Sequence, residues 1–568
     1  MGRIKCMNEF FPTMLAVTCF SIVVLLGSAA FPGSSLPLQE MNEFLRNRIE
    51  AAGFPPEITV GEEVIYATTM LPIFYERRAY QLAWNNQSGS LPHTQAFLNA
   101  LYRAEEEGLV ASDYHLSRIE AILKKIRQEQ ANKRAFDYRR LVDLDLLLTD
   151  AFLIYGSHLL AGRINPETLY AEWHANRREL DLAKFLQGAL DANRAGEALQ
   201  DLLPLHLDYR RLKQALKHYR DTATKGGWPT ITSGPLLKKG DEGERITALC
   251  ARLWATGELG EKLSDRGDLF DDNVDLAVRR FQERYGLDID GIVGPQTLAA
   301  LNTPVEERIR QIELNLERWR WLPQDLGERY VLVNIASFQS DVVEKDESVL
   351  TMRVIVGKSY RRTPVFSDKI SYLVLSPYWH IPHSIATKDI LPLIHKDPDY
   401  LAKQNIKVFL GWGADSREID PQGIDWARVS ANSFPYRLRQ EPGPNNALGQ
   451  VKFMFPNKFN VYLHDTAARE LFAQSARSFS SGCIRIENPI DLAEYLLRDK
   501  PGWIREKIIT SIEKRVEQTV SLSKPIPVHL LYWTAWSDEN GSVHFRKDIY
   551  DRDSSLDKAL REKSLTGK

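Results

Sequence analysis

The chain has 568 residues, of which 43% are hydrophobic and 26% are charged. A length of this order predicts about three or four domains, each with a hydrophobic core of its own. The formal net charge at pH 7 is only −2, because 73 basic residues are balanced by 75 acidic ones. The composition therefore gives no electrostatic case for nucleic acid binding.

The amino-terminal segment predicts export. Arg3 and Lys5 precede an apolar run over residues 14–26, and small residues at 28–30 suit cleavage by a signal peptidase. The apolar segment is also nearly long enough to cross a bilayer as an uncleaved anchor with its basic end inside. We therefore interpret residues 1–30 as a signal peptide or signal anchor, and we expect the rest of the chain in the periplasm or cell envelope.

Residues 36–235 predict a helical scaffold domain. The stretch 140–155 is apolar almost all round, as in a helix buried inside a bundle, and its aspartates argue against a second membrane span. No catalytic set of residues appears in this region. We expect it to pack on or position a catalytic domain.

Residues 238–302 predict a second, smaller helical domain. The stretch 275–285 has an apolar stripe, and Gly286 follows it where a helix needs a left-handed cap. A turn-rich link, DIDGIVGPQTL at 288–298, leads into a short closing helix. The pattern resembles the small three-helix peptidoglycan-binding domain, which in multidomain enzymes binds the wall or serves as a spacer.

A helix is expected next, with Thr303 as its cap, Pro304 at its first position and Glu306 completing a capping box. Its apolar positions lie on one face: Ile309, Ile312, Leu316 and Trp319. We expect this face to pack against a catalytic sheet. From Tyr330 the apolar period changes to two, which predicts a mixed β-sandwich.

The strand pattern fails between residues 383 and 450, where Pro and Gly repeatedly break the chain. An insertion of this length is typical of a lid or a binding loop. We interpret it as a cap over an active site, with Trp412 and Trp426 either lining that site or packing inside the insertion. A β-hairpin extension is predicted over residues 516–568.

The strongest functional signal is His464, near the end of an alternating strand pattern, followed by Cys483 in the sequence SSGCIR at 480–485. A thiolate is a strong nucleophile, and a neighbouring imidazole can take the thiol proton and later protonate a leaving amine. The small residues before the sulfur let a substrate approach, so that the N–H groups of Gly482 and Cys483 can face a developing oxyanion. This arrangement is typical of acyl transfer.

The other cysteines carry no such signal. Cys6 and Cys19 fall in the targeting segment, and Cys250 lies in an apolar stripe at helical spacing, which predicts packing. The mature chain is therefore expected to rest on hydrophobic cores rather than on disulfides.

His464 and the SSGCIR sequence resemble the signature of the L,D-transpeptidases, the cysteine enzymes that cross-link peptidoglycan. Three upstream blocks are similar to the same family: VIVGKSYRRTPVF at 354–366, SPYWHIP at 376–382 and RQEPGPNNALG at 439–449. Many members carry His before the Gly-Cys pair and Asn two positions after the Cys, where this chain has Ser481 and Arg485. The larger subfamily with a helical scaffold shares these replacements.

The resemblance implies an α+β multidomain fold. Its parts are a helical scaffold domain (36–235), a peptidoglycan-binding-like domain (238–302) and a mixed β-sandwich catalytic domain (303–515) with a capping insertion (383–450). The similarity to the family is most specific over residues of about 300–550. In the scaffold it rests on the less specific GRINP sequence at 162–166 and on Trp84.

The resemblance also implies a mechanism without a cofactor. Cys483 would attack the third residue of a tetrapeptide stem, protonated His464 would release the terminal D-alanine, and the thioester would pass to an amine of a second stem as a 3→3 cross-link. Carbapenem-type β-lactams are expected to acylate the same sulfur. The expected substrate-binding residues are Arg485, which would hold a stem carboxylate, Ser481, Tyr462 and Trp379. The group that orients His464 is left open between Asp465, Ser481 and a nearby backbone group.

Two other functions remain open from the sequence. A hydrolase with the same two residues would pass the acyl group to water, and a non-catalytic wall-binding protein would depend on residues 238–302 alone. Peptidoglycan stem peptides are the expected partners, with wall-synthesis enzymes and membrane attachment left open. His380 and His383 flank Pro382, which breaks the helix that would put them on one face, so no metal site is predicted.

Overall fold

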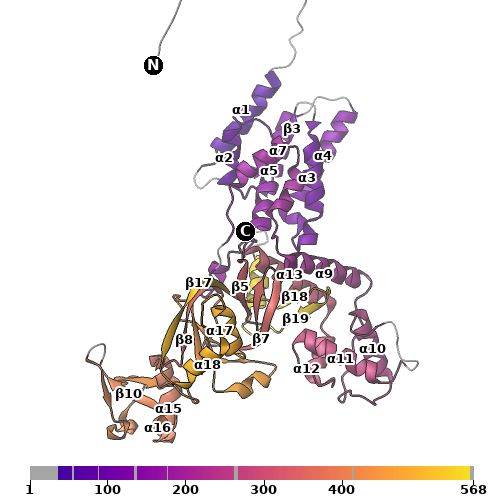
Figure 1. Ribbon diagram of the computed structural model, residues 1–568. Helices are drawn as coiled ribbons and strands as arrows, with labels where there is room; N and C mark the ends of the chain where they lie inside the picture. Colours follow the sequence, from indigo (N-terminus) through magenta and orange to yellow (C-terminus); the bar gives the residue numbers. More distant parts are fainter. Residues whose placement is uncertain are drawn as a thin grey trace, which may run out of the picture.

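The computed structural model describes residues 36–53, 57–86, 89–132, 137–174, 177–260, 267–411 and 415–562. The predicted targeting segment 1–30 and Trp412 lie outside these residues. Figure 1 shows a helical scaffold at the top, a β-rich domain at the lower left and a small helical domain at the lower right, with α9 and α13 between them.

The scaffold is a bundle built around one buried helix, α5 (Tyr138–Ala161). The elements around it are α1 (Leu36–Glu50), β1 (Thr59–Val60), β2 (Glu63–Val64), α2 (Met70–Arg77), β3 (Asn85–Asn86), β4 (Gly89–Ser90), α3 (Pro92–Tyr102), α4 (Leu116–Ala131), α7 (Leu182–Asp191) and α8 (Ala195–Ala198). The short helix α6 (Pro166–Leu169) instead contacts α19 near the carboxy terminus. Among the described residues, α5 is the helix long and apolar enough to cross a bilayer, but 83% of its most apolar window is buried inside the protein.

The buried aspartates of α5 are explained by their partners. Asp145 accepts hydrogen bonds from the Tyr75 hydroxyl and from the N–H groups of Ala83 and Trp84. Asp150 accepts from the N–H groups of Tyr66 and Ala67. Buried carboxylates with several donors cost far less than unpaired ones, so these residues fix the neighbouring loops onto the core helix.

The scaffold core ends before the predicted domain boundary at residue 235. Its apolar cluster runs from Met41 to Leu202, whereas α9 (Leu207–Thr224) contributes Leu212 and Leu216 to the second large cluster. In that cluster α9 packs along α13 (Val305–Arg320). The chain therefore passes finally into the second core between Leu202 and α9, after Ile164, Tyr170 and Trp173 have already contributed to it.

The small helical domain consists of α10 (Glu244–Ala255), α11 (Asp272–Tyr285) and α12 (Pro295–Leu301). Gly286 follows α11 with a φ of 64°, so the predicted left-handed cap is confirmed. Cys250 is buried in the apolar core, so its predicted packing role is also confirmed.

The linking helix α13 differs from its prediction at its amino-terminal cap. Thr303 does not cap it, because the Thr303 hydroxyl donates to the carbonyl of Ala299 and so closes α12. The face with Ile312, Leu316 and Trp319 is buried as expected, in the core cluster that also holds residues of the main sheet, and α13 also contacts α9 and the carboxy-terminal β18. Trp319 stacks on Trp533 with ring centroids 4.2 Å apart.

The β-rich domain is one nine-stranded mixed sheet in the order β15-β7-β16-β14-β13-β8-β17-β5-β6. Because β6 also pairs with β7, the predicted sandwich is a single sheet that closes on itself around an apolar core. The strands are β5 (Arg329–Asn334), β6 (Gln339–Glu344), β7 (Glu347–Gly357), β8 (Phe366–Leu375), β13 (Val451–Met454), β14 (Leu463–His464), β15 (Ser478–Ser480), β16 (Ile484–Ile486) and β17 (Gln518–Leu531), followed or flanked by α17 (Pro489–Leu497) and α18 (Arg505–Glu513).

The carboxy-terminal region is more than the predicted hairpin extension. Strand β17 lies inside the sheet, antiparallel to β8 and parallel to β5. A hairpin of β18 (Ala535–Ser537) and β19 (Val543–Phe545) follows, and then helix α19 (Arg552–Glu562). The predicted hairpin extension of the catalytic domain over 516–568 therefore also contains a strand of the main sheet, in which the alternating stretch 526–531 has a partner on each side.

The insertion folds around a small core of its own. Its four-stranded sheet has the order β11-β10-β12-β9, with β9 (Trp379–Ile381), β10 (Ile406–Leu410), β11 (Arg417–Ile419) and β12 (Tyr436–Gln440). Its helices include α14 (His383–Ile385), α15 (Leu391–Lys396) and α16 (Tyr400–Lys403). The prediction that strands are absent from residues 383–450 is therefore wrong. The insertion extends from the main sheet at the lower left of Figure 1.

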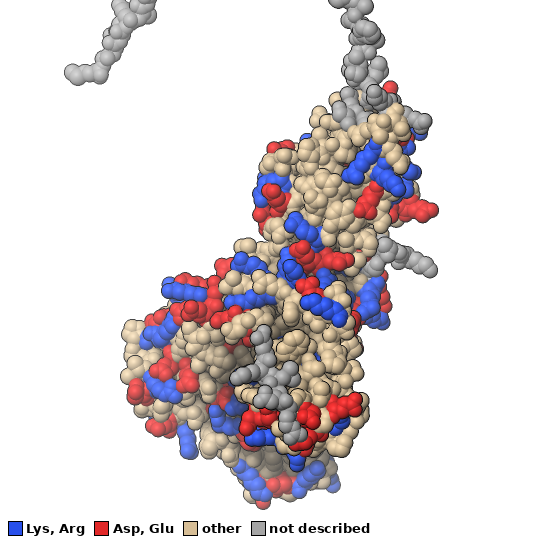
Figure 2. All heavy atoms as spheres, turned by 90° about the vertical axis from the view of Figure 1, so that its right-hand side faces the viewer, with Lys and Arg blue, Asp and Glu red and all other residues tan. Residues whose placement is uncertain are grey.

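The charged side chains are mixed on the surface. On the face in Figure 2, Lys and Arg alternate with Asp and Glu over all described parts, and neither sign forms a broad patch.

Candidate active site

Three neighbouring strands bring the predicted residues to one face of the sheet. Strand β14 runs parallel to β16, with Leu463 opposite Ile484 and His464 opposite Arg485. Leu463 and Ile484 are fully buried in the core. Because side chains alternate along a strand, Tyr462, His464, Cys483 and Arg485 share the opposite face.

A lysine completes this face. Lys452 of β13 is the register partner of His464 on the other side of β14. Its Nζ lies 3.9 Å from the centroid of the Tyr462 ring, a cation–π contact. The sequence analysis did not single out Lys452, although the alternating VKFMF stretch at 451–455 places it on the face opposite the buried Val451 and Phe453.

Cys483 lies in a tight turn over the end of β7. The chain pairs with β7 in parallel at Ser480, opposite Gly357, and returns antiparallel with Arg485 opposite Ile355. Gly482 has a φ of 118°, a conformation that side chains rarely tolerate, so glycine is required for the turn. The sulfur is thereby held partly exposed between two fixed strand segments.

His464 is oriented by the backbone. Its Nδ1 lies 2.5 Å from the carbonyl oxygen of Asp465, and since a carbonyl can only accept, Nδ1 must carry the proton. Nε2 is then the unprotonated nitrogen of the neutral ring. The backbone of Leu448 also contacts the imidazole. The Asp465 carboxylate is engaged elsewhere, with the N–H of Gln450 and with Arg469. Of the three groups left open by the sequence, the backbone carbonyl of Asp465 holds the ring.

The electrostatics keep both reacting groups neutral at rest. Burial and the nearby Arg485 guanidinium lower the pKa of His464 to about 3. Burial raises the pKa of the Cys483 thiol, while hydrogen bonding from Tyr462 and the charges of Lys452 and Arg485 act in the opposite direction. A resting ion pair of thiolate and imidazolium is therefore disfavoured, and the cations stabilise negative charge as it forms on sulfur.

The sulfur and the imidazole share the face without a direct hydrogen bond between these two described residues. The Cys483 Sγ lies 3.9 Å from the carbonyl oxygen of Asn460, and the Tyr462 and His464 rings lie 5.6 Å apart, edge to face. Catalytic hydrogen bonds are often long before a substrate binds, so this geometry is compatible with proton transfer in a complex.

Comparisons with known proteins assign the domains. Residues 328–508 match the family model described as "L,D-transpeptidase catalytic domain", residues 70–216 match "Scaffold domain", and residues 242–301 match "Putative peptidoglycan binding domain". The chain carries an L,D-transpeptidase catalytic domain.

Two curated proteins are similar to parts of the chain. A protein of Haemophilus influenzae named "Putative L,D-transpeptidase" is 36% identical over 258 residues, which cover 45% of this chain and 51% of that protein. The N-acetylmuramoyl-L-alanine amidase CwlM of Mycobacterium tuberculosis is 39% identical over 80 residues, 13% of this chain and 20% of that protein. The chain thus spans about half the length of the first relative and a fifth of the second.

Solved structures add nothing to this assignment. The L,D-transpeptidase of Stackebrandtia nassauensis aligns with 14% identity and a TM-score of 0.21, covering 53% of this chain and 96% of that one.

In the transpeptidase domain, Arg485 is the predicted substrate-binding residue with a free donor. Its Nε is buried and has no hydrogen-bond partner among the described residues. An unpaired guanidinium N–H beside the reactive sulfur is costly unless a ligand pairs with it. Ser481 is exposed, and its Oγ accepts from Arg361, so it does not orient His464.

Two other predictions for the transpeptidase domain are wrong or unsupported. The N–H of Gly482 is not free for an oxyanion, because it donates to Ser480 Oγ at 3.1 Å. Within the described chain the N–H of Cys483 has no such partner. Trp379 packs against the apolar core of the insertion, and no ring contact or hydrogen bond of its side chain to Cys483 or His464 is present among the described residues.

Trp426 is a packing residue of the insertion. Its indole N–H donates to the carbonyl of Pro421, and its ring contacts Tyr436. Within the described residues, no group of three or more His, Cys, Asp or Glu side chains is arranged to hold a metal ion.

Proposed function

We propose that this protein is an exported L,D-transpeptidase that forms 3→3 cross-links between peptidoglycan stems through a thioester on Cys483. The observation that carries the proposal is the shared face of Cys483, His464 and Arg485 inside a domain that matches the L,D-transpeptidase catalytic family. The two helical parts match scaffold and peptidoglycan-binding families, which supports the wall as the substrate.

The first half-reaction breaks the amide between the third residue of a tetrapeptide stem and its terminal D-alanine. The Cys483 sulfur attacks the amide carbonyl while His464 Nε2 accepts the thiol proton. The imidazolium formed in this step then passes the proton to the leaving nitrogen. D-Alanine leaves, and the thioester remains.

The second half-reaction transfers the acyl group. The side-chain amine of a second stem attacks the thioester carbonyl, and neutral His464 takes a proton from that amine. A new amide forms, the carbon–sulfur bond breaks, and the proton returns to sulfur. In both halves the N–H of Cys483 is the candidate donor to the oxyanion, since it has no partner in the described chain.

Arg485 is proposed to bind a carboxylate of the stem. Its unpaired Nε faces the same side of the sheet as the sulfur. A charge-assisted hydrogen bond to a carboxylate would satisfy this buried donor and position the donor stem for attack.

The test is product analysis with purified donor and acceptor stems. A transpeptidase gives the cross-linked dimer and one equivalent of D-alanine, and Cys483→Ala gives neither. If the tripeptide stem appears without the cross-linked dimer, the protein is a hydrolase rather than a transpeptidase. If the protein binds the wall but releases no D-alanine, its function is binding alone.

A further inference from the structure

The turn that carries the nucleophile is tied down by a buried threonine. The Thr363 Oγ1 donates to the carbonyl of Gly482 at 2.9 Å and accepts from the N–H of Gly357 at 2.9 Å. Thr363 is fully buried. A single hydroxyl thus joins the end of β7 to the residue immediately before Cys483.

A tyrosine from the carboxy-terminal segment holds the same loop. The Tyr550 hydroxyl donates to the carbonyl of Gly357 at 2.5 Å and accepts from the N–H of Thr363 at 3.2 Å. Tyr550 is also fully buried. Gly357 is sterically fixed in this arrangement, because a Cβ there would lie 2.1 Å from the carbonyl oxygen of Arg361.

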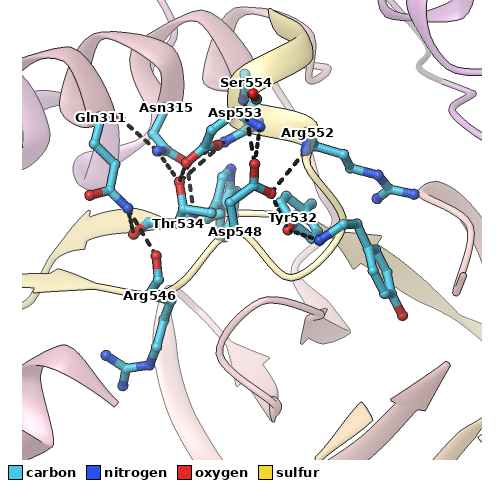
Figure 3. Close-up of polar contacts among 12 residues, drawn as sticks. Gln311, Asn315, Tyr532, Thr534, Arg546, Asp548, Arg552, Asp553 and Ser554 are labelled. Atoms are coloured by element: carbon cyan, nitrogen blue, oxygen red, sulfur yellow. Dashed lines mark hydrogen bonds and ion pairs between the residues drawn. The ribbon is translucent and has the colours of Figure 1, made fainter. Parts of the chain in front are cut away.

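The network in Figure 3 anchors this tyrosine. The N–H of Tyr550 donates to the Tyr532 hydroxyl, which itself donates to Asp548 at 2.6 Å. Asp548 also accepts from the N–H groups of Arg552 and Asp553 at the start of α19 (Figure 3). The segment that carries Tyr550 is therefore fixed at both ends.

Two further contacts connect this anchor to the rest of the protein. Asp553 pairs with Arg318 of α13 at 2.6 Å and accepts from the Thr534 hydroxyl, which Figure 3 shows beside it. On the scaffold side, the N–H of Val365 donates to the carbonyl of Glu172, close to Thr363 in the chain.

The geometry of the peptide bond gives this anchor a chemical consequence. The carbonyl of Gly482 and the N–H of Cys483 belong to one planar trans peptide unit and point in opposite directions. A hydrogen bond that fixes the carbonyl therefore also fixes the direction of the N–H. That N–H is the candidate oxyanion donor, because the N–H of Gly482 is already occupied.

We propose that Thr363 and Tyr550 are positioning residues that hold the Gly482–Cys483 peptide so that the N–H of Cys483 faces the oxyanion. This inference rests on the proposed acyl transfer at Cys483. The hydroxyl of Thr363 acts directly on the peptide, and the hydroxyl of Tyr550 acts through Gly357 and the backbone of Thr363.

The test compares acylation of Cys483 with its alkylation. Acylation by a carbapenem develops an oxyanion, whereas alkylation by iodoacetamide is a displacement at carbon that develops none. In Thr363→Val and Tyr550→Phe we expect the maximal acylation rate to fall at least about tenfold, since oriented oxyanion donors are worth this much or more. The half-saturating carbapenem concentration and the alkylation rate should stay within about twofold, because binding and thiolate exposure are untouched.

Two controls separate positioning from folding. Thr363→Ser keeps the hydroxyl and should acylate within about twofold of the wild type. Tyr75→Phe deletes a buried hydroxyl with two partners in the scaffold and should lower the unfolding temperature without slowing acylation. If Thr363→Val does not fold, Tyr550→Phe alone tests the positioning role.

The outcomes are distinct. The proposal is overturned if Thr363→Val and Tyr550→Phe acylate at the wild-type maximal rate, or if alkylation falls in parallel with acylation. A wild-type protein that alkylates with iodoacetamide but never forms the carbapenem adduct would refute the proposed function itself, and this inference with it.

Discussion

Two equally buried histidines in this molecule have opposite charge environments. His115 in the scaffold and His464 in the transpeptidase domain are both 5% exposed. His115 lies between Glu63 and Asp150, each 2.8 Å away, and although burial alone would lower its pKa, the two carboxylates raise it. His464 faces Arg485 and Lys452 instead, so burial and these cations act in the same direction and lower its pKa to about 3.

Burial lowers the pKa of both rings, so the difference between the two histidines comes from their partners. Two carboxylates make His115 a structural cation that ties β2 and α5 to the start of α4. A backbone carbonyl and two cations leave His464 neutral, with an unprotonated nitrogen that can take a proton. At the scaffold site both ring nitrogens of His115 have carboxylate partners. On the catalytic face, Arg485 Nε and the N–H of Cys483 have no partner among the described residues.

The largest expected effect comes from removing each imidazole in turn. His464→Ala should slow carbapenem acylation of Cys483 by a factor of about 10³, as expected for the loss of a general base. His115→Ala should leave that rate within about twofold and lower the unfolding temperature of the scaffold, because the buried Asp150 carboxylate loses its partner. The rates are measured by mass spectrometry over a time course. Equal acylation rates in the two variants would contradict a catalytic role for His464 and a structural role for His115.

A smaller effect is expected from Lys452, the cation that the sequence analysis missed. Its charge opposes the burial that raises the pKa of Cys483. Lys452→Met should therefore raise this pKa further and lower the iodoacetamide alkylation rate at pH 7.5 by about three- to tenfold, since one pKa unit is about tenfold in thiolate. The matched control is Lys407→Met, which removes a lysine paired with Glu418 on the insertion. An unchanged pH profile of alkylation would exclude the electrostatic role of Lys452.

The pH dependence of stability should have opposite signs at the two histidines. The folded pKa of His115 is raised, so its contribution is present below the unfolded value of 6.5 and is lost as pH rises through the folded pKa. The folded pKa of His464 is about 3, so stability is lost as pH falls from 6.5 toward 3.

Each slope is at most about 1.4 kcal/mol per pH unit. Hydrogen exchange of peptides from each domain between pH 5 and 8 measures this slope. The variants His115→Gln and His464→Gln should abolish the pH dependence of their own domain. Slopes of the same sign in both domains would contradict the assigned charge states.

The smallest effect is expected at the contact between the insertion and the active-site loop. Arg361 bridges Asp389 of the insertion and Ser481 beside the nucleophile. Asp389→Asn should change acylation less than about threefold, because partly exposed ion pairs contribute little. Asp397→Asn, which breaks an ion pair to Lys403 elsewhere in the insertion, is its control. A loss beyond about tenfold in Asp389→Asn alone would make this contact a major support of the site.

The sequence predicted the part of the site that local patterns encode. His464, Cys483 and Arg485 were predictable because two short strand segments with alternating apolar residues carry them. The role of the Asp465 carbonyl was not predictable, since any residue supplies a carbonyl and only the ring geometry selects one. Gly482 failed as an oxyanion donor because Ser480, a neighbour that was read only as small, accepts its N–H.

The errors in the predicted fold also come from partners that lie outside the local sequence pattern. Thr303 and Pro304 fit a helix start in sequence, but the hydroxyl had a competing partner in the preceding helix. Strands β10 and β12 lie in a Pro- and Gly-rich insertion whose sheet is defined by pairing with each other rather than by long alternation. The position of β17 between β8 and β5 is a long-range property that no local pattern contains.

The most direct measurement is peptide mapping by mass spectrometry after a brief reaction with a tetrapeptide stem and an acid quench. We predict that the peptide containing Cys483 gains the mass of the stem less D-alanine, and that this gain disappears on addition of an acceptor stem. An unmodified Cys483 with D-alanine released, or an acyl group on any other residue, would contradict the thioester at this sulfur.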